Sequence, residues 1–232
     1  MTADDLIAYW SRMEDRAVHP DDDAFVDRQK FETRLHPVPW AGPLKAAKVC
    51  FLFLNPGLSE QDVAYETSNT DFSAILRANV RDGLQPYFYL LERFDAHPGY
   101  RWARRIFGRD IREAQTDSFC VVQLVAYHSA EGAPARGIAD KLPSTGKARQ
   151  FVRNTLVPNA RAGHIGLIVA RSAKLWLVDE NSQDENLVVY RRGECRGAFQ
   201  TKDTRGGQLF RRKLSRFPNA PSLQLAALSQ SK

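Results

Sequence analysis

The sequence predicts an α/β fold: a three-layer sandwich around a central four-stranded, mainly parallel sheet. Four apolar runs without polar alternation are typical of strands buried on both faces, and they lie at 49–54, 119–126, 165–170 and 187–190. Segments with helical spacing separate these runs, as the crossovers between parallel strands require. The 232 residues, 43% of them hydrophobic, are enough for one large domain with its own core.

The first 36 residues are expected to form a helical extension that packs on this core. One helix is indicated by apolar residues at helical spacing: Leu6, Ile7, Tyr9, Trp10 and Met13. A second helix is expected through Phe25, Phe31 and Leu35. The prolines that follow interrupt any helix and mark an entry loop. The main domain is then expected over residues 37–217, with 218–232 as a packed strap or tail.

Helices are expected between the strands. Those between the first two runs are predicted at 72–80, 86–94 and 100–114. Between the second and third runs, Ser144 or Thr145 is expected to cap a helix that runs to Leu156. Shorter helices are predicted after the third and fourth runs, at 171–178 and at 207–216.

Composition excludes several classes of protein. No run approaches the roughly 18 apolar residues of a membrane helix, and the polar start of the chain lacks a secretory signal, so a cytoplasmic location is expected. The three cysteines, Cys50, Cys120 and Cys195, are too few for a disulfide framework or a four-cysteine metal centre and are expected to be reduced. The five histidines are scattered. We therefore expect neither a metal nor a cofactor.

Basic residues exceed acidic ones by 33 to 27, a net charge of +6 that favours a polyanionic partner. The excess gathers in two segments. Residues 190–217 hold nine basic and two acidic side chains, and residues 93–112 hold six arginines and two aspartates. Solvated helix faces are also rich in arginine, so charge alone leaves both interpretations open.

Asn55 directly follows the first buried run, within the sequence Leu-Asn-Pro-Gly-Leu-Ser at 54–59. Ligands of open α/β sheets bind beyond the carboxyl ends of the strands. Pro56 fixes one backbone angle and Gly57 permits close approach, so the carboxamide of Asn55 would be held rigidly at this edge and would position water. Asn-Pro-Gly is also a strong turn signal, so a plain turn is the alternative.

Residues 51–59 resemble the first motif of the uracil-DNA glycosylase superfamily, in particular its mismatch-specific branch, where Asn-Pro-Gly-Leu follows an apolar run. The resemblance extends in element order over residues 38–216. It implies a protein that binds DNA, flips out an abnormal or mismatched base and hydrolyses the N-glycosidic bond without a cofactor. In that scheme Asn55 orients the water that attacks the sugar carbon.

The resemblance also implies a base pocket that includes Gly57, Phe72 and Gln123. Gln123 stands on the second expected strand, where one branch of the family reads the flipped base with a side-chain amide; a strand amide satisfied by its neighbours is the alternative. For Phe72 the alternative is plain core, as is usual for an aromatic side chain near a core strand. His128 follows the second run and is the candidate proton donor, or else a structural loop histidine.

The family's second motif, His-Pro-Ser or Asn-Pro-Ser-Gly, does not follow the fourth run. Its place is taken by a basic loop whose arginines are expected to bind DNA phosphates, and a second phosphate site is expected where a Gly-rich loop feeds a helix N-terminus. These DNA-backbone candidates are Arg191, Arg192, Arg196, Arg205 and Gly207.

Arginine cannot deliver a proton at neutral pH, so the basic loop does not supply the proton donor of the missing second motif. A second function therefore stays open. That function is a non-catalytic nucleic-acid or nucleotide-binding module on the same fold. A small-molecule α/β hydrolase is a third possibility, with Ser59 or Ser129 as nucleophile, although neither stands in a Gly-x-Ser-x-Gly motif.

Overall fold

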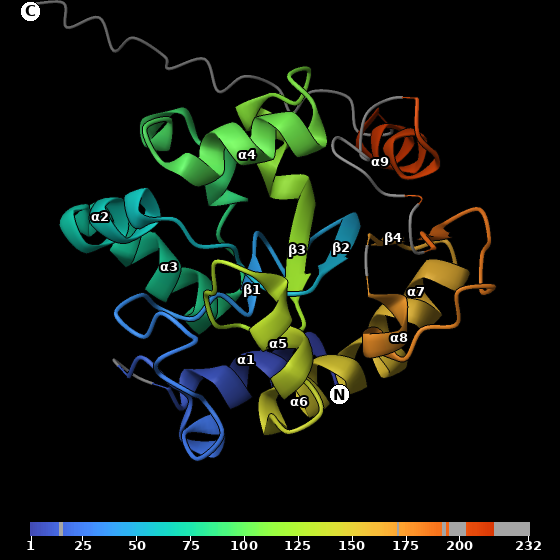
Figure 1. Ribbon diagram of the computed structural model, residues 1–232. Coiled ribbons are helices and arrows are strands. Elements are labelled where there is room, and N and C mark those ends of the chain that lie inside the picture. The colour runs from blue at the N-terminus through green and yellow to red at the C-terminus, as the bar shows by residue number, and fades with distance from the viewer. Residues whose placement is uncertain (14–15, 171, 192–193, 195–202, 216–232) are drawn as a thin grey trace, which may run out of the picture.

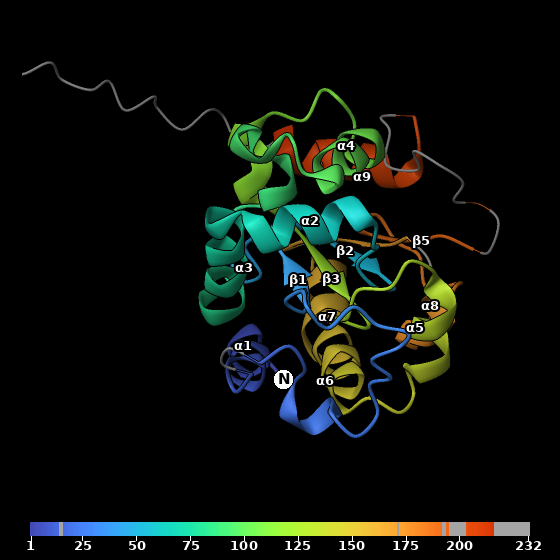
Figure 2. The same cartoon turned by 60° about the vertical axis from the view of Figure 1, so that its left-hand side comes forward.

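The computed structural model describes residues 1–13, 16–170, 172–191, 194 and 203–215. They form an α/β fold with one mixed sheet between two layers of helices (Figures 1 and 2). The strand order is β1-β3-β2-β4-β5. The strands are β1 (Trp40–Ala41), β2 (Val49–Phe53), β3 (Phe119–Gln123), β4 (Gly166–Val169) and β5 (Leu187–Val189).

The sheet has one strand more than the sequence predicts. The four expected runs form its parallel part, whereas β1 pairs with β3 in the antiparallel direction. The expectation of four strands was wrong because β1 has only two residues and follows a proline, so it carries no strand pattern of its own. This short edge strand aligns Trp40 with Val122.

Both faces of the sheet are buried, as unbroken apolar strands require. Cys50 and Cys120 lie side by side on β2 and β3, with their sulfur atoms 3.3 Å apart. Both are buried free thiols, and the hydrogen bond that Cys120 donates to Cys50, together with burial, raises the pKa of the Cys120 thiol. Cys195 lies outside the described residues.

One face of the sheet carries the N-terminal helix and the chain between β3 and β5, as Figure 2 shows. Its helices are α1 (Ala3–Ser11), α5 (Gly132–Ile138), α6 (Pro143–Phe151), a π-helical turn (Val152–Leu156), α7 (Val157–Arg161) and α8 (Ala173–Trp176). Leu6 and Trp10 of α1 belong to the same apolar cluster as Leu52 of the sheet. The N-terminal segment is therefore part of the core of this face.

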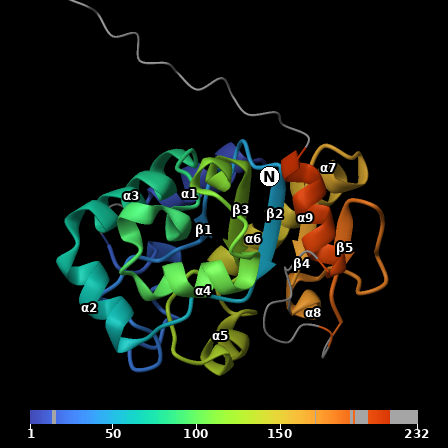
Figure 3. The same cartoon turned by 90° about the horizontal axis from the view of Figure 1, so that it is seen from above.

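The other face carries the elements that shape the functional site. Its helices are α2 (Glu60–Ser68), α3 (Thr70–Asp82), α4 (Pro98–Phe107) and α9 (Arg205–Ser215), with 3-10 turns at Phe88–Leu90, Glu92–Phe94 and Glu113–Ser118. Seen from above in Figure 3, α4 crosses the strands β2 and β3, and α9 lies along β4 and β5. Phe51 joins them, because its ring contacts Phe107 of α4 and Phe210 of α9.

The expected second N-terminal helix was wrong. The one helical element in residues 20–35 is a 3-10 turn at Pro20–Asp22; Val26, Phe31 and Leu35 are buried, whereas Phe25 is exposed. The buried carboxylate of Asp22 holds this segment, because it accepts hydrogen bonds from the Tyr127 hydroxyl at 2.7 Å and from the Ser144 amide at 3.0 Å. These contacts tie the segment to the loop after β3 and to the start of α6.

Other expected helices differ at their ends. The cap at Ser144 or Thr145 was wrong: Leu142 is the N-cap of α6, Pro143 occupies the first turn, and the Thr145 hydroxyl donates to the Leu124 carbonyl. The segment 86–94 forms two 3-10 turns, and α4 ends at Phe107, before Gly108, which has a φ of 108°. No helix within the described ranges is both long and apolar enough to cross a bilayer.

Candidate active site

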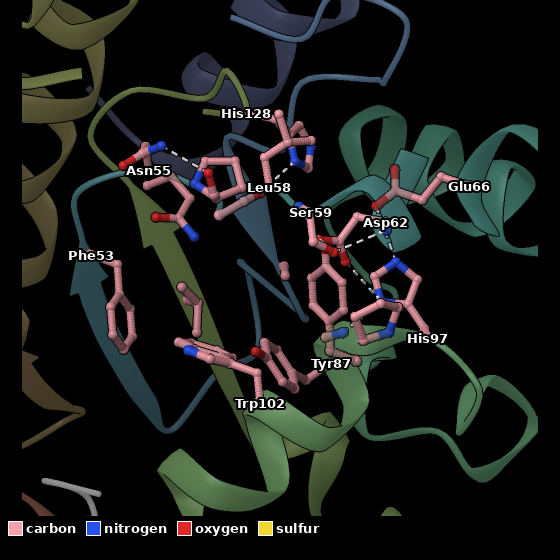
Figure 4. Close-up of a pocket in the computed structure, with 18 residues that line it drawn as sticks. Phe53, Asn55, Leu58, Ser59, Asp62, Glu66, Tyr87, His97, Trp102 and His128 are labelled. Atoms are coloured by element: carbon pink, nitrogen blue, oxygen red, sulfur yellow. Dashed lines mark hydrogen bonds and ion pairs between the residues drawn. The ribbon is translucent and has the colours of Figure 1, made fainter. Parts of the chain in front are cut away.

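A cavity of about 300 Å³ opens where β2 and β3 end. Its walls are mainly apolar and aromatic: Ala41, Phe53, Leu58, Tyr87, Tyr89, Trp102 and Val121. Polar side chains interrupt the walls: Asn55, Ser59, Asp62, Glu66, His97, Gln123 and His128. Figure 4 shows Asp62, Glu66 and His97 gathered on one side of the cavity, with Phe53 and Asn55 on the other.

Asn55 is held by two hydrogen bonds, both from its amide nitrogen. Nδ2 donates to the Pro56 carbonyl at 2.8 Å and to Ser129 Oγ at 2.9 Å, and Ser129 Oγ donates onward to the Glu131 carbonyl. The side chain thus bridges its own turn to the loop after β3. No described residue pairs with Oδ1, which is left to accept a hydrogen bond from water or a ligand.

Gln123 is the last residue of β3 and lies opposite Phe53 of β2 in the parallel register. Its backbone amide donates to the Pro39 carbonyl, but its buried Oε1 has no partner among the residues the structure describes. An unpaired buried acceptor costs about 1–3 kcal/mol. Its neighbours therefore leave this acceptor unsatisfied, which is the arrangement that a ligand-reading amide requires.

A buried Glu66–His97 pair forms the far wall. His97 and Glu66 are only 2% and 4% exposed, and His97 Nε2 lies 3.1 Å from Glu66 Oε1. The Gly99 amide donates to His97 Nδ1 at 2.8 Å, so in the neutral ring the proton sits on Nε2 and is donated to Glu66. Glu66 Oε2 has no partner in the described part of the chain.

Sequence reasoning missed this pair because its members are 31 positions apart, on α2 and at the cap of α4. The one local signal is His97-Pro98-Gly99, in which a polar cap precedes a proline in the first turn. That signal predicts a helix start, but it does not indicate that the ring faces a carboxylate.

Phe72 does not line the cavity. It is fully buried and stacks on the His97 ring with centroids 4.4 Å apart, so it supports the cavity wall from behind. Gly57 does line the cavity, and a Cβ at this position would meet no atom within 4 Å. Packing within the protein therefore does not demand glycine at position 57.

His128 lines the cavity, but both of its ring nitrogens face backbone carbonyls. Nδ1 lies 3.0 Å from the Gly57 oxygen and Nε2 lies 3.2 Å from the His36 oxygen. Its own carbonyl accepts from the Glu32 amide. These contacts tie the turn after β2 to the entry loop. Each ring nitrogen therefore already has a partner within the protein.

Three of the expected DNA-backbone residues are described by the structure, Arg191, Arg205 and Gly207, and none of these three lines the cavity. The guanidinium of Arg191 donates to Asn181 Oδ1, and that of Arg205 contacts Glu194 and Gln183. The Gly207 amide lies in the first turn of α9 and donates to Thr204 Oγ1 at 3.0 Å, so it already has a protein partner. Arg192 and Arg196 fall outside the described residues.

A cationic groove adjoins the cavity, and we name it the α4 groove. It is lined by Pro98, Tyr100, Arg101, Trp102, Arg104, Arg105, Gly108 and Arg109. Pro98 and Trp102 line both hollows, so the groove lies directly beside the cavity. Arg105 and Arg109 are exposed, and their guanidinium groups have no hydrogen-bond partner or ion pair among the described residues.

The described residues contain no group of three or more His, Cys, Asp or Glu side chains arranged to hold a metal ion. The arrangement instead offers hydrogen bonds and aromatic surface in a cavity and positive charge at its mouth. In comparisons with protein-family models, curated proteins and solved structures, no match to this chain was found.

Proposed function

We propose that the protein is a DNA glycosylase. It binds DNA, takes an abnormal or mismatched base out of the helix and hydrolyses the N-glycosidic bond of that base. The proposal rests on a cavity that is lined by Asn55 and Gln123 and lies directly beside the α4 groove. The cavity is at the lower end of the roughly 300–1,000 Å³ typical of small-ligand sites, as one base requires.

The walls of the cavity suit a planar heterocycle. Tyr87, Tyr89 and Trp102 supply aromatic surface, and stacking of a base on such rings is worth about 1–3 kcal/mol. Gln123 adds an amide that pairs with the donor and acceptor groups of a base edge. Flipping is least costly at a damaged or mismatched position, which adds selectivity before any bond breaks.

The groove outside the cavity suits the phosphate backbone. Its lining includes four arginines and no carboxylate, whereas the cavity lining includes Asp62 and Glu66 and no lysine or arginine. Phosphates are therefore attracted to the groove and repelled from the cavity. A strand lying along α4 would place its flipped base beside Trp102, which lines both hollows.

Asn55 orients the attacking water in this mechanism. Its Oδ1 accepts a hydrogen from water and directs the water oxygen towards the sugar carbon, while Nδ2 stays fixed by Pro56 and Ser129. The carbon–nitrogen bond breaks with its electron pair on the base. Overall, water supplies a hydroxyl group to the sugar and a proton to the released base. A carboxamide is no general base, so a weakened glycosidic bond must precede the attack.

The proposal is tested by base release from duplexes that carry uracil, hypoxanthine or a mismatch, measured as abasic sites. We expect the wild type to release a base from at least one of these duplexes, and we expect a loss of about a hundredfold on that duplex in Asn55→Ala, because the water is no longer positioned. Asn154→Ala, at an exposed asparagine far along the chain, is the control and should match the wild type. Equal release by the wild type and Asn55→Ala would remove Asn55 from the mechanism.

One observation favours a second candidate, a non-catalytic nucleic-acid-binding module. Both nitrogens of His128 face backbone carbonyls, so the side chain expected to protonate the leaving base serves to hold a loop. This candidate predicts salt-dependent DNA binding with no abasic product at any protein concentration. The same set of duplexes separates the two functions.

A further inference from the structure

The side of the cavity formed by α2 offers acceptors without donors of its own. Glu66 Oε1 is occupied by the His97 ring, and Asp62 Oδ2 accepts from both the amide and the hydroxyl of Ser59. Glu66 Oε2 remains buried and unpaired, as does Gln123 Oε1 among the described residues. A buried carboxylate oxygen without a partner is costly, so this site is built for a hydrogen-bond donor from outside the chain.

The Glu66 carboxylate is held in one orientation. The Gly99 amide fixes the tautomer of His97, and that ring stacks on Phe72 and meets Tyr65 edge-on at 4.9 Å. The ring cannot turn away without losing these contacts. Its Nε2 hydrogen therefore keeps Oε1 engaged and leaves Oε2 as the free acceptor.

We infer that the cavity selects a base that carries an exocyclic amino group, which donates to Glu66 Oε2. The inference rests on the proposed function, because it names the class of base that this cavity takes. Cytosine and adenine carry such a group, whereas uracil and hypoxanthine carry a carbonyl oxygen at the same position. A carbonyl placed against a buried carboxylate leaves two acceptors facing each other, which the cavity rejects.

The test compares the binding of four short oligonucleotides that differ at one residue and are abasic elsewhere. The single base is cytosine, uracil, adenine or hypoxanthine, on a 2′-fluorinated sugar that resists hydrolysis. We expect the wild type to bind cytosine over uracil, and adenine over hypoxanthine, by about tenfold or more. Equal affinity within each pair, or failure to bind any of the four, would overturn the inference.

Glu66→Gln gives a sharper readout than loss of binding. The new amide accepts from His97 with its oxygen and turns its NH2 group to the position of Oε2, so the acceptor becomes a donor. The preference should therefore reverse in favour of uracil and hypoxanthine. Glu60→Gln, at an exposed glutamate of the same helix, should keep the wild-type order. An equal loss for all four oligonucleotides in Glu66→Gln would mean that Glu66 is only structural.

The wild-type comparison needs no variant, so it stands even if Glu66→Gln does not fold. Failure of the proposed function gives a different result. If the amino preference holds but cleavable duplexes yield no abasic sites, the cavity recognises such bases without hydrolysing them. If abasic sites form with no preference for amino bases, the function stands and the inference about Glu66 falls.

Discussion

At the scale of single residues, the cavity wall keeps polar groups away from bulk water. Burial raises the pKa values of Tyr87 and Tyr89, and nearby Glu66 adds to the increase for Tyr89. Burial likewise raises the pKa of Tyr127, whose hydroxyl donates to Asp22. The protonated phenol is therefore strongly favoured in the folded state at each of these positions.

These raised pKa values predict a loss of stability at alkaline pH. An unfolded tyrosine ionises near its ordinary pKa of 10.0, while the folded one keeps its proton. The contribution of each buried tyrosine is therefore complete below about pH 10 and is lost as the pH rises towards the folded pKa. Tyr87→Phe should make the fall in unfolding free energy shallower by up to about 1.4 kcal/mol per pH unit.

Urea unfolding of the wild type and Tyr87→Phe between pH 8 and 11 checks this expectation. Near pH 8 the two proteins should unfold alike apart from a constant offset, because neither unfolded state is ionised at position 87. Parallel curves over the whole alkaline range would show that Tyr87 does not hold its proton in the folded protein.

Some of the polar residues that line the cavity could be predicted from the sequence, and others could not. Asn55 was expected directly after the first apolar run, and it follows β2; Gln123 was expected within the second run, 119–126, but it is the last residue of β3. Glu66 and His97 were not foreseen, since their pairing depends on how α2 packs near α4. The roles proposed for Asn55 and Gln123 remain predictions.

At the scale of elements, α4 joins the cavity to the groove. The His97 cap begins it, and its buried residues Ala103, Ile106 and Phe107 pack on the sheet face. The opposite side carries the arginines of the α4 groove and Trp102, which is 36% exposed. From the sequence, the arginines of residues 93–112 could form either a solvated helix face or a binding site for a polyanion. Its position beside the cavity favours the polyanion site.

Binding of DNA along α4 predicts a defined salt dependence. Each phosphate contact adds about 0.9 to the slope of log affinity against log salt for duplex DNA. Arg105→Ala and Arg109→Ala should each lower the slope by up to that amount, as measured by fluorescence anisotropy with a labelled duplex. Arg153→Ala, an exposed arginine on the other side of the sheet, is the matched control.

Arg205, at the start of α9, was the other expected contact for the DNA backbone and tests the alternative placement. Arg205 is paired with Glu194 and Gln183, so Arg205→Ala should leave the slope unchanged. A lower slope in Arg205→Ala together with a wild-type slope in Arg105→Ala and Arg109→Ala would place the backbone at the C-terminal loops and not along α4.

At the scale of the whole molecule, the α/β class and the four parallel strands could be predicted because buried strands of a parallel sheet leave long apolar runs. Two features could not. The short β1 depends on pairing with the edge of β3, and the irregular segment 20–35 depends on the distant partners of Asp22. Both features depend on tertiary contacts, which the local hydrophobic pattern of the sequence does not indicate.

In the proposed complex, one base occupies the cavity while its strand lies along α4. A crystal structure with an oligonucleotide that carries one 2′-fluorinated, uncleavable nucleotide tests this claim most directly. We expect a base within contact of Gln123 and Asn55, with neighbouring phosphates beside Arg105 and Arg109. An empty cavity with the strand bound elsewhere on the molecule would contradict it.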